Sequence, residues 1–215
     1  FRRCRGPRSR PTGRRTERAD AAAGPFGATR RTLPRAQPTR RLPVLSSVQA
    51  RCFRLPRKFV ALNAGLYILS GGRSSRFGSD KGLYLFRGEP LVRQVAGQFS
   101  QLFSRERVII VSSNREGYER MGFEVIPDLR PGQLGPLAGI EAAARHAQGR
   151  FPLFFVTSCD RFGLQEGWLV ELAEALERTE ALAAAYFAQY WQPFPSAFRP
   201  QVADWTGRLL DQGET

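Results

Sequence analysis

The chain has 215 residues, a formal net charge of +14 and three cysteines. Residues 1–60 contain 17 lysines and arginines but only two acidic residues. This segment therefore holds all of the excess positive charge, and the remainder of the chain is nearly neutral. Three unevenly spaced cysteines without a CxxC pair argue against a disulfide framework and against a zinc site, and no apolar run approaches the ~20 residues of a membrane helix. The composition predicts a soluble protein of a reducing compartment.

Residues 1–58 are predicted to form a disordered basic tail. They are rich in Arg and Pro and show no helix or strand period, so they cannot bury enough apolar surface to offset the entropy of ordering. Such a tail would serve organelle targeting or attract nucleic acid or anionic membrane, although it lacks the aromatics of a single-strand stacking surface. The alternative is a segment without function or mis-assigned coding sequence, because the chain begins with Phe. One domain is expected over residues 59–215.

Short apolar runs rich in β-forming residues recur in this domain. The expected strands are residues 66–69, 108–111, 123–126, 153–156 and 182–187. Helical spacing of apolar residues between them predicts helices that begin near Leu91, Leu137 and Trp168. Strands that are apolar on both faces and alternate with helices predict an α/β domain, with a mostly parallel sheet covered on both sides.

Polar segments follow the first four expected strands. They are SGGRSSR (70–76), SSNR (112–115), PDLRPGQLGPLAG (127–139) and TSCD (157–160). The carboxyl ends of parallel strands meet at one edge of a sheet, which is where ligands of such proteins bind. The sequence therefore predicts a single cleft lined by four loops.

The first of these loops has the chemistry of an anion site. Gly71 and Gly72 let backbone N–H groups approach a ligand, and Arg73, Arg76 and Lys81 add positive charge, a combination that suits a polyphosphate. Neither GxxxxGK[ST] nor GxGxxG is present, which excludes the P-loop and the dinucleotide fingerprint. A solvated glycine turn with scattered surface arginines is the alternative.

Two acidic residues stand at the other strand ends. Asp160 directly follows an apolar strand, a common place for a carboxylate that holds Mg²⁺ against substrate phosphates, or else for a helix N-cap. Asp128 is able to accept hydrogen bonds from a base or ribose, or to begin a turn. Asn114 offers both a donor and an acceptor. The only histidine, His146, is expected to face solvent, which removes Ser-His-Asp and His-metal catalysis from consideration.

Three motifs in order resemble those of the molybdenum cofactor guanylyltransferases. LSGGRSSRFGSDKGLYLFRGEPL (69–91) resembles the family's L-x-G-G-x-S-x-R-M-G-x-D-K-x-L opening. PDLRPGQLGPLAGI (127–140) is similar to its Asp loop ending in G-P-L-A-G, and FFVTSCD (154–160) to its apolar strand ending in Cys-Asp. The resemblance covers roughly residues 64–200.

The resemblance implies a three-layer, Rossmann-like nucleotidyltransferase domain. Its members use GTP and Mg²⁺ and attach GMP to the terminal phosphate of molybdopterin, releasing pyrophosphate. It implies that Arg76, Lys81 and Asp160 are catalytic and that Asp160 holds the metal. It implies nucleotide contacts from Leu69, Ser70, Gly71, Gly72, Lys81, Asn114, Asp128 and Asp160. It also implies a cytoplasmic monomer without membrane or nucleic-acid partners, in transient contact with cofactor-biosynthesis proteins or acceptor molybdoenzymes.

The chain departs from the family pattern at several positions. Ser70 stands where Ala is usual, Phe77 where Met is usual, and CDRFGL (159–164) lacks the family's proline. The family continues beyond the last residues of this chain with a helix and an edge strand, so a C-terminally truncated domain is expected. The alternatives are a molybdopterin cytidylyltransferase or another small-molecule nucleotidyltransferase, and a non-catalytic nucleotide- or nucleic-acid-binding module.

Overall fold

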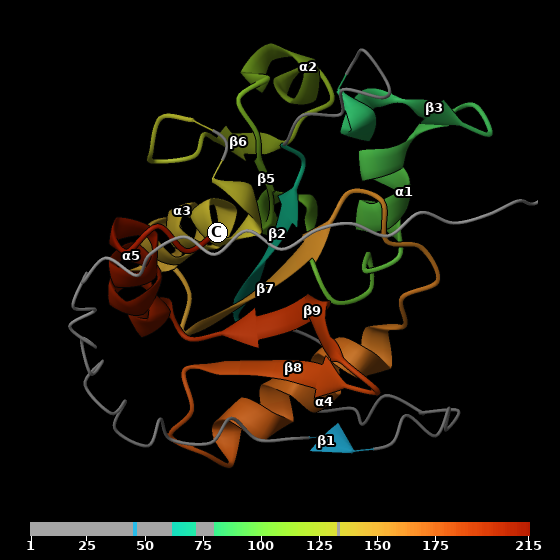
Figure 1. Ribbon diagram of the computed structural model, residues 1–215. Helices are drawn as coiled ribbons and strands as arrows, with labels where there is room; N and C mark the ends of the chain where they lie inside the picture. The colour runs from blue at the N-terminus through green and yellow to red at the C-terminus, as the bar shows by residue number, and fades with distance from the viewer. Residues whose placement is uncertain (1–44, 47–61, 72–79, 133) are drawn as a thin grey trace, which may run out of the picture. The chain divides into compact units, whose positions relative to one another are not determined.

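A seven-stranded sheet in the order β1-β8-β9-β7-β2-β5-β6 organises the computed structural model (Figure 1), which describes residues 45–46, 62–71, 80–132 and 134–215. All of these residues lie in one compact unit, Arg40–Thr215. The strands are β1 (Leu45–Ser46), β2 (Ala64–Leu69), β5 (Val108–Val111), β6 (Glu124–Ile126), β7 (Leu153–Ser158), β8 (Ala183–Phe187) and β9 (Trp191–Phe198). A separate hairpin joins β3 (Leu85–Phe86) to β4 (Glu89–Pro90).

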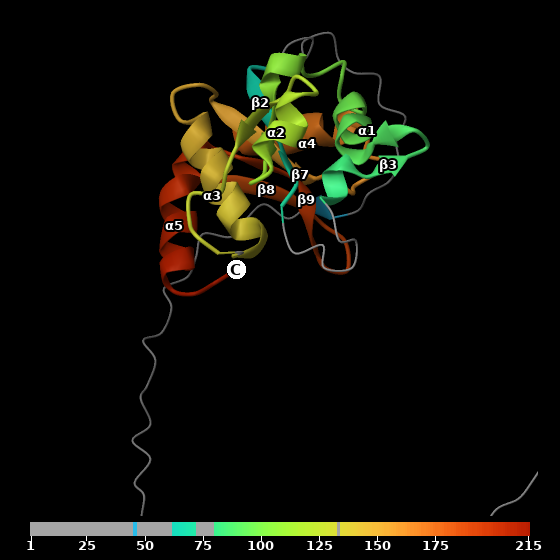
Figure 2. The same cartoon turned by 90° about the horizontal axis from the view of Figure 1, so that it is seen from above.

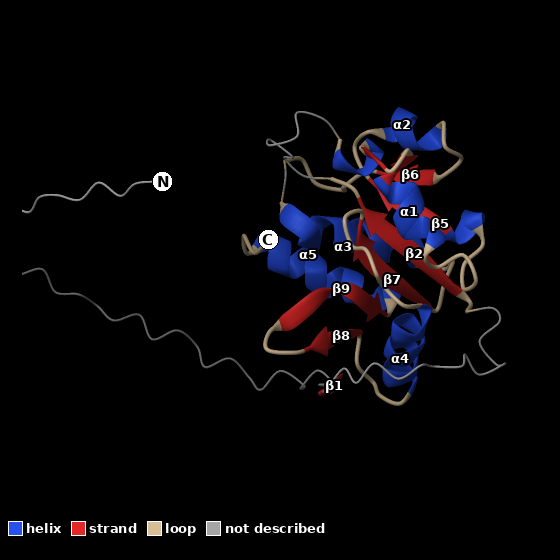
Figure 3. Cartoon of the chain, turned by 90° about the vertical axis from the view of Figure 1, so that its right-hand side faces the viewer, coloured by secondary structure: helices blue, strands red, loops and turns tan. Residues whose placement is uncertain are grey.

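The centre of the sheet is parallel, as predicted. β2 pairs with β7 on one side and with β5 on the other, and β5 pairs in parallel with β6. All four residues of β5 are buried, because both faces of this strand are covered. Figure 3 shows β7 and β2 running next to each other between flanking helices.

Helices cover both faces of the sheet (Figure 2), and a core of buried side chains lies on each face. One core lies under α1 (Leu91–Gly97), α2 (Arg115–Glu119) and α4 (Glu166–Glu177) and includes Phe99, Tyr118 and Leu172. The other lies under α3 (Gly135–Ala147) and α5 (Ala203–Asp211), where the alanines of α3 bring that helix close to the sheet. Each fully buried Leu or Phe contributes roughly 1.5–3 kcal/mol. The predicted α/β architecture is confirmed.

The short strands β1, β3 and β4 and the long strand β9 were not predicted from the sequence, and β9 is the one that lies inside the sheet. β9 lies between β7 and β8 and runs antiparallel to both. It contains Pro193 and Pro195, and proline usually argues against an inner strand because it cannot donate to the ladder. The pairing with β8 is interrupted between Ala185 and Tyr186, so both prolines fall where the ladder is irregular.

Two further differences concern the ends of elements. β1 pairs in parallel with β8, although its two residues lie within the segment expected to be a tail; the rest of residues 1–58 lies outside the described residues. α1 ends at Gly97, while Phe103 is still buried in the turns that follow. None of the helices in the part of the chain that the structure describes is both long and apolar enough to span a bilayer.

Candidate active site

The ends of β7, β2, β5 and β6 are adjacent in the sheet and point the same way. Hydrogen bonds between neighbouring strand ends continue just past the ladders: Cys159 N–H donates to Leu69 O at 3.1 Å, Ser70 N–H to Val111 O at 2.9 Å and Ser112 N–H to Ile126 O at 2.9 Å. The four segments that were predicted to line one cleft therefore leave the sheet at one edge.

An ion pair joins the segment after β2 to the segment after β7. Lys81 Nζ lies 2.5 Å from Asp160 Oδ2, and Ser158 Oγ donates to Asp160 Oδ1 at 2.6 Å. Both charged side chains remain partly open to solvent, at 33% for Lys81 and 42% for Asp160. The hydrogen bonds from Lys81 and Ser158 lower the pKa of the Asp160 carboxyl, so it is ionised at neutral pH.

Asp80 connects two strand ends to the short 3-10 helix η2 (Lys81–Leu83). Its Oδ1 accepts from Tyr118 Oη at 2.5 Å and from Gly82 N–H at 3.0 Å, and its Oδ2 accepts from Asn114 Nδ2 at 3.2 Å. The hydroxyls of Ser70 and Tyr118 lie 2.5 Å apart. Because Asp80 also caps η2, this network fixes the backbone that carries Lys81.

The absence of a side chain at Gly82 leaves room for the hydroxyls of Ser70 and Tyr118, which belong to the hydrogen-bond network of Asp80. A Cβ at this position would lie 2.1 Å from Ser70 Oγ and 2.4 Å from Tyr118 Oη, closer than any real contact. Gly139, in the GPLAG segment, plays a similar part, since its Cβ would lie 2.9 Å from Leu69 Cδ2. Both glycines let neighbouring backbone approach the end of β2.

Asp128 lies two residues beyond β6 and is exposed. Its carboxylate makes no hydrogen bond with any of the described residues, and partial desolvation by the surrounding protein raises its pKa. Asp128 therefore stands apart from the polar network of Asp80, although it leaves the same edge of the sheet.

The structure thus brings together part of the predicted set. Ser70 and Asn114 meet through Asp80, and Lys81 meets Asp160. Leu69 and Gly71 lie at the end of β2, whereas Gly72 and Arg76 lie outside the described residues. Sequence reasoning missed the roles of Asp80, Tyr118 and Ser158 in supporting these side chains. Asp80 was visible as half of an Asp-Lys pair, but nothing in the local sequence of Tyr118 signals its contact.

The expectation that His146 faces solvent is wrong. Its Nδ1 lies 2.8 Å from the hydroxyl of buried Tyr67, its Nε2 lies 3.1 Å from Glu124 Oε1, and its side chain is 19% exposed. A buried tyrosine hydroxyl requires a partner, and His146 supplies it at the end of α3. His146 belongs to the face of the sheet under α3 and α5.

The described side chains could bind a metal ion only if a bound substrate supplied further ligands to it. No group of three or more His, Cys, Asp or Glu residues in residues 62–71, 80–132 and 134–215 is arranged to hold one. At the joined ends of β2 and β7, Asp160 offers a partly exposed carboxylate beside the ammonium group of Lys81. A single carboxylate suits Mg²⁺, which commonly keeps several waters and completes its shell with substrate phosphates.

Comparison with known proteins gives a consistent result. The family model "MobA-like NTP transferase domain" matches residues 66–215. A probable molybdenum cofactor guanylyltransferase of Deinococcus radiodurans is 36% identical over 148 residues, which cover 68% of this chain and 73% of that protein. A molybdenum cofactor guanylyltransferase of Shewanella frigidimarina is 34% identical over 151 residues, covering 68% and 74%.

A solved structure shares the fold. The crystal structure of molybdopterin-guanine dinucleotide biosynthesis protein A from Archaeoglobus fulgidus has a TM-score of 0.57 and 26% sequence identity, and the match covers 70% of this chain and 74% of that one. The matched region contains the four strand ends and the residues that leave them. The chain belongs to the family of MobA-like NTP transferases, and is a nucleotidyltransferase related to the molybdenum cofactor guanylyltransferases.

Proposed function

We propose that the chain transfers GMP from GTP to the terminal phosphate of the molybdopterin cofactor and releases pyrophosphate. The relatives' names support this reaction. The observation that carries the proposal is the contact of Lys81 with Asp160, which places a cation and a carboxylate at the joined ends of β2 and β7. We also propose that the chain acts in the cytoplasm as a monomer, with transient contacts to proteins that make or receive the cofactor.

The chemical step needs charge neutralisation rather than a protein nucleophile. A phosphate oxygen of the acceptor forms a bond with the α-phosphorus of GTP, and the bond between that phosphorus and the oxygen bridging to the β-phosphate breaks. The electron pair leaves with pyrophosphate. Two anions approach each other in this step, so Lys81 supports it by holding positive charge beside the phosphates. Arg76 is proposed for the same role because it matches the family motif.

The nucleotide is proposed to lie across the strand ends. Leu69, Ser70, Gly71 and Gly72 line its phosphates and sugar, while Asn114 and Asp128 contact the guanosine. Asn114 leaves β5 and Asp128 leaves the neighbouring β6, so these two contacts come from adjacent loops. A carboxylate such as Asp128 accepts hydrogen bonds from the ring N–H and exocyclic amino group of guanine, two donors that cytosine does not present in this arrangement.

Asp160 is proposed to hold Mg²⁺ together with the phosphates of GTP. The ion would supply positive charge to the phosphate oxygens during transfer. Because Lys81 contacts one oxygen of Asp160 and Ser158 contacts the other, the carboxylate is kept ionised and oriented before any ligand arrives.

Equilibrium binding of GTP, CTP and ATP to the full chain, each with and without Mg²⁺, tests the assignment. We expect GTP to bind most tightly and Mg²⁺ to strengthen its binding in the wild type but not in Asp160→Asn. Tighter binding of CTP would make the chain a cytidylyltransferase. Absence of nucleotide binding, together with steeply salt-dependent binding of DNA or RNA, would make it a nucleic-acid-binding module.

A further inference from the structure

The loop between β6 and α3, residues 127–134, carries Asp128 and has few apolar contacts to hold it. Pro127, Asp128, Leu129, Pro131 and Gly132 are all exposed. The backbone reaches α3 through Gly132 and Gly135, which have φ of 90° and 71°, values that residues with a side chain rarely adopt. Arg130 and Leu134 are the only described residues of this loop that are less than exposed. The conformation of Asp128 therefore depends on how the loop is fastened elsewhere.

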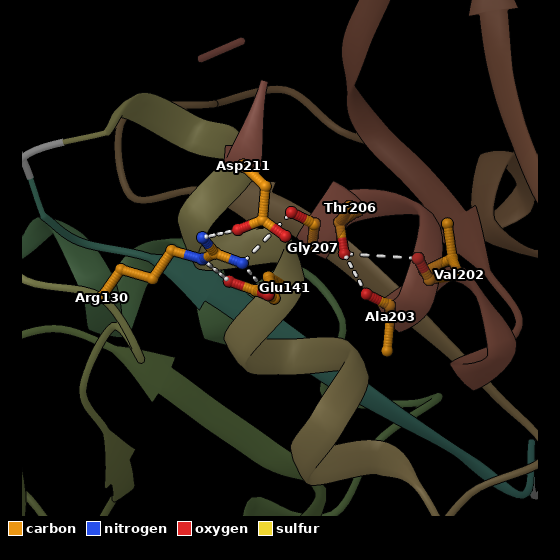
Figure 4. A network of polar contacts seen from close by, with 7 residues as sticks. All are labelled: Arg130, Glu141, Val202, Ala203, Thr206, Gly207 and Asp211. Atoms are coloured by element: carbon orange, nitrogen blue, oxygen red, sulfur yellow. Dashed lines mark hydrogen bonds and ion pairs between the residues drawn. The ribbon is translucent and has the colours of Figure 1, made fainter. Parts of the chain in front are cut away.

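Arg130 fastens the loop to two helices (Figure 4). Its guanidinium donates to both carboxylate oxygens of Glu141 in α3, at 2.8 Å and 3.0 Å. It also donates to Asp211 Oδ1 at 2.5 Å and to the Gly207 carbonyl at 3.1 Å, both in α5. Three of its nitrogens are thus held by three residues, which fixes both the place and the orientation of the planar group.

The contact with Glu141 compensates a buried charge. Only 6% of the Glu141 side chain is exposed, and a buried carboxylate requires a charged or hydrogen-bonded partner. α5 comes so close at this point that a Cβ on Gly207 would lie 2.9 Å from Glu141 Oε1. The hydrogen bonds that Arg130 donates to Glu141 and Asp211 raise the pKa of its guanidinium, which stays charged at every relevant pH. The three residues form a rigid junction of loop, α3 and α5.

We propose that Arg130 is a positioning residue for nucleotide recognition, which holds Asp128 at the guanine base by anchoring its loop to Glu141 and Asp211. This inference rests on the proposed binding of GTP and assigns α5, which lies outside the four strand ends, a role in base selection. Arg130 acts through Asp128 and touches neither the phosphates nor the acceptor. Loosening the junction weakens the base contact while the phosphate site around Lys81 and Asp160 is preserved.

The variant must avoid a buried uncompensated charge, because removing one partner of such a pair destabilises a fold for reasons unrelated to the ligand. The double variant Arg130→Gln/Glu141→Gln replaces both charges with amides of similar length. We expect its affinity for GTP to fall about tenfold or more, as for a lost hydrogen bond to a charged group. Its affinity for inorganic tripolyphosphate, which lacks a base, stays at the wild-type value.

Arg145→Gln provides a matched control. Arg145 Nη1 lies 3.0 Å from Asp204 Oδ1, so this pair also links α3 to α5, but it does not include the loop that carries Asp128. We expect wild-type affinity for both GTP and tripolyphosphate. Equal weakening of GTP binding in the control and in the double variant would show that α3 and α5 matter only through general stability, and would overturn the assignment.

Combination with Asp128→Asn separates positioning from other effects. If Arg130 acts through Asp128, the triple variant Asp128→Asn/Arg130→Gln/Glu141→Gln binds GTP no more weakly than Asp128→Asn alone. Additive losses, or unchanged GTP affinity in Arg130→Gln/Glu141→Gln, contradict the inference while leaving the proposed function intact. Failure of the wild-type chain to bind GTP overturns both.

Discussion

At the scale of single residues, the contact between Lys81 and Asp160 sets the charge state of the site. The hydrogen bond from Lys81 is the largest cause of the lowered pKa of Asp160. We expect Lys81→Met to raise that pKa toward the ordinary value of about 3.9, as measured by NMR titration of the carboxyl carbon. Arg115→Met, which breaks an exposed pair with Glu119, is the control and leaves the pKa of Asp160 unchanged.

The same shift has a consequence for acid stability. A carboxyl whose pKa is lower in the folded chain stabilises the fold above its unfolded pKa, and this contribution disappears as the pH falls through the folded pKa. Because Lys81→Met raises the folded pKa of Asp160, the urea midpoint of this variant is expected to decrease less on acidification than that of the wild type. Identical pH profiles for wild type and variant between pH 5 and pH 2 would show that the ion pair does not hold in solution.

The second prediction at this scale concerns Gly82 and rests on steric overlap rather than on charge. A methyl group there would overlap the hydroxyls of Ser70 and Tyr118. We expect Gly82→Ala to lower the free energy of unfolding by about 1–3 kcal/mol, as overpacking of a closed site does. Gly97→Ala is the matched control, because Gly97 lies in α1 with no neighbouring atom within 4 Å of the added carbon. It is expected to be neutral or stabilising by up to about 1 kcal/mol. Equal stabilities would contradict the predicted overlap.

At the scale of elements, His146 links α3 to β2 and β6 and makes that junction sensitive to pH. Burial is the largest cause of its lowered pKa, and the neighbouring Arg150 lowers it further while Glu124 opposes the shift. The unfolded chain therefore binds a proton at His146 more readily than the folded chain does. Stability is expected to decrease as the pH falls below about 6.5, the ordinary histidine value.

His146→Gln tests this sign. Glutamine keeps a polar contact to the Tyr67 hydroxyl but does not titrate, so the variant should lose less stability than the wild type between pH 7.5 and pH 5.5. Urea unfolding at the two pH values measures the difference. The range stays above the region in which Glu124, whose pKa is lowered by Arg150, loses its charge. A variant with the same pH dependence as the wild type would show that another group is responsible.

Elements and site differ in how far the sequence predicts them. β5 is a continuous apolar run and β7 begins with one, and polar residues follow each run, which is the pattern of buried parallel strands. β9 could not be predicted, because its two prolines are tolerated only through a local irregularity in pairing with β8. The proximity of Lys81 and Asp160 could be predicted, because both lie in segments that follow the carboxyl ends of adjacent parallel strands. The contact between Tyr118 and Asp80 could not, because these residues are 38 positions apart in sequence and meet only in the folded chain.

At the scale of the whole molecule, we expect the basic segment to take no part in the active site. We propose that residues 59–215 are the catalytic domain. β1 lies at the far edge of the sheet, with β8 and β9 between it and β7, so loss of β1 does not reach Asp160 directly. Deletion of residues 1–58 is therefore expected to leave the affinity for GTP unchanged and to remove any salt-dependent binding of nucleic acid.

Deletion of residues 1–39 is the control, since it retains β1 and the compact unit Arg40–Thr215. Wild-type affinity for GTP after the shorter deletion but a loss after the longer one would place the domain boundary before β1. A loss of GTP affinity after both deletions would show that the basic segment takes part directly in nucleotide binding.

The central claim is that the joined strand ends form one site that transfers GMP. Pyrophosphate release from GTP in the presence of Mg²⁺ and molybdopterin, with detection of the guanine dinucleotide product, tests it most directly. We expect turnover by the wild type, wild-type turnover by Arg145→Gln, and a loss of about 100-fold or more in Lys81→Met and Asp160→Asn. Full turnover by either of those two variants, or product formed from CTP in preference to GTP, would contradict the account.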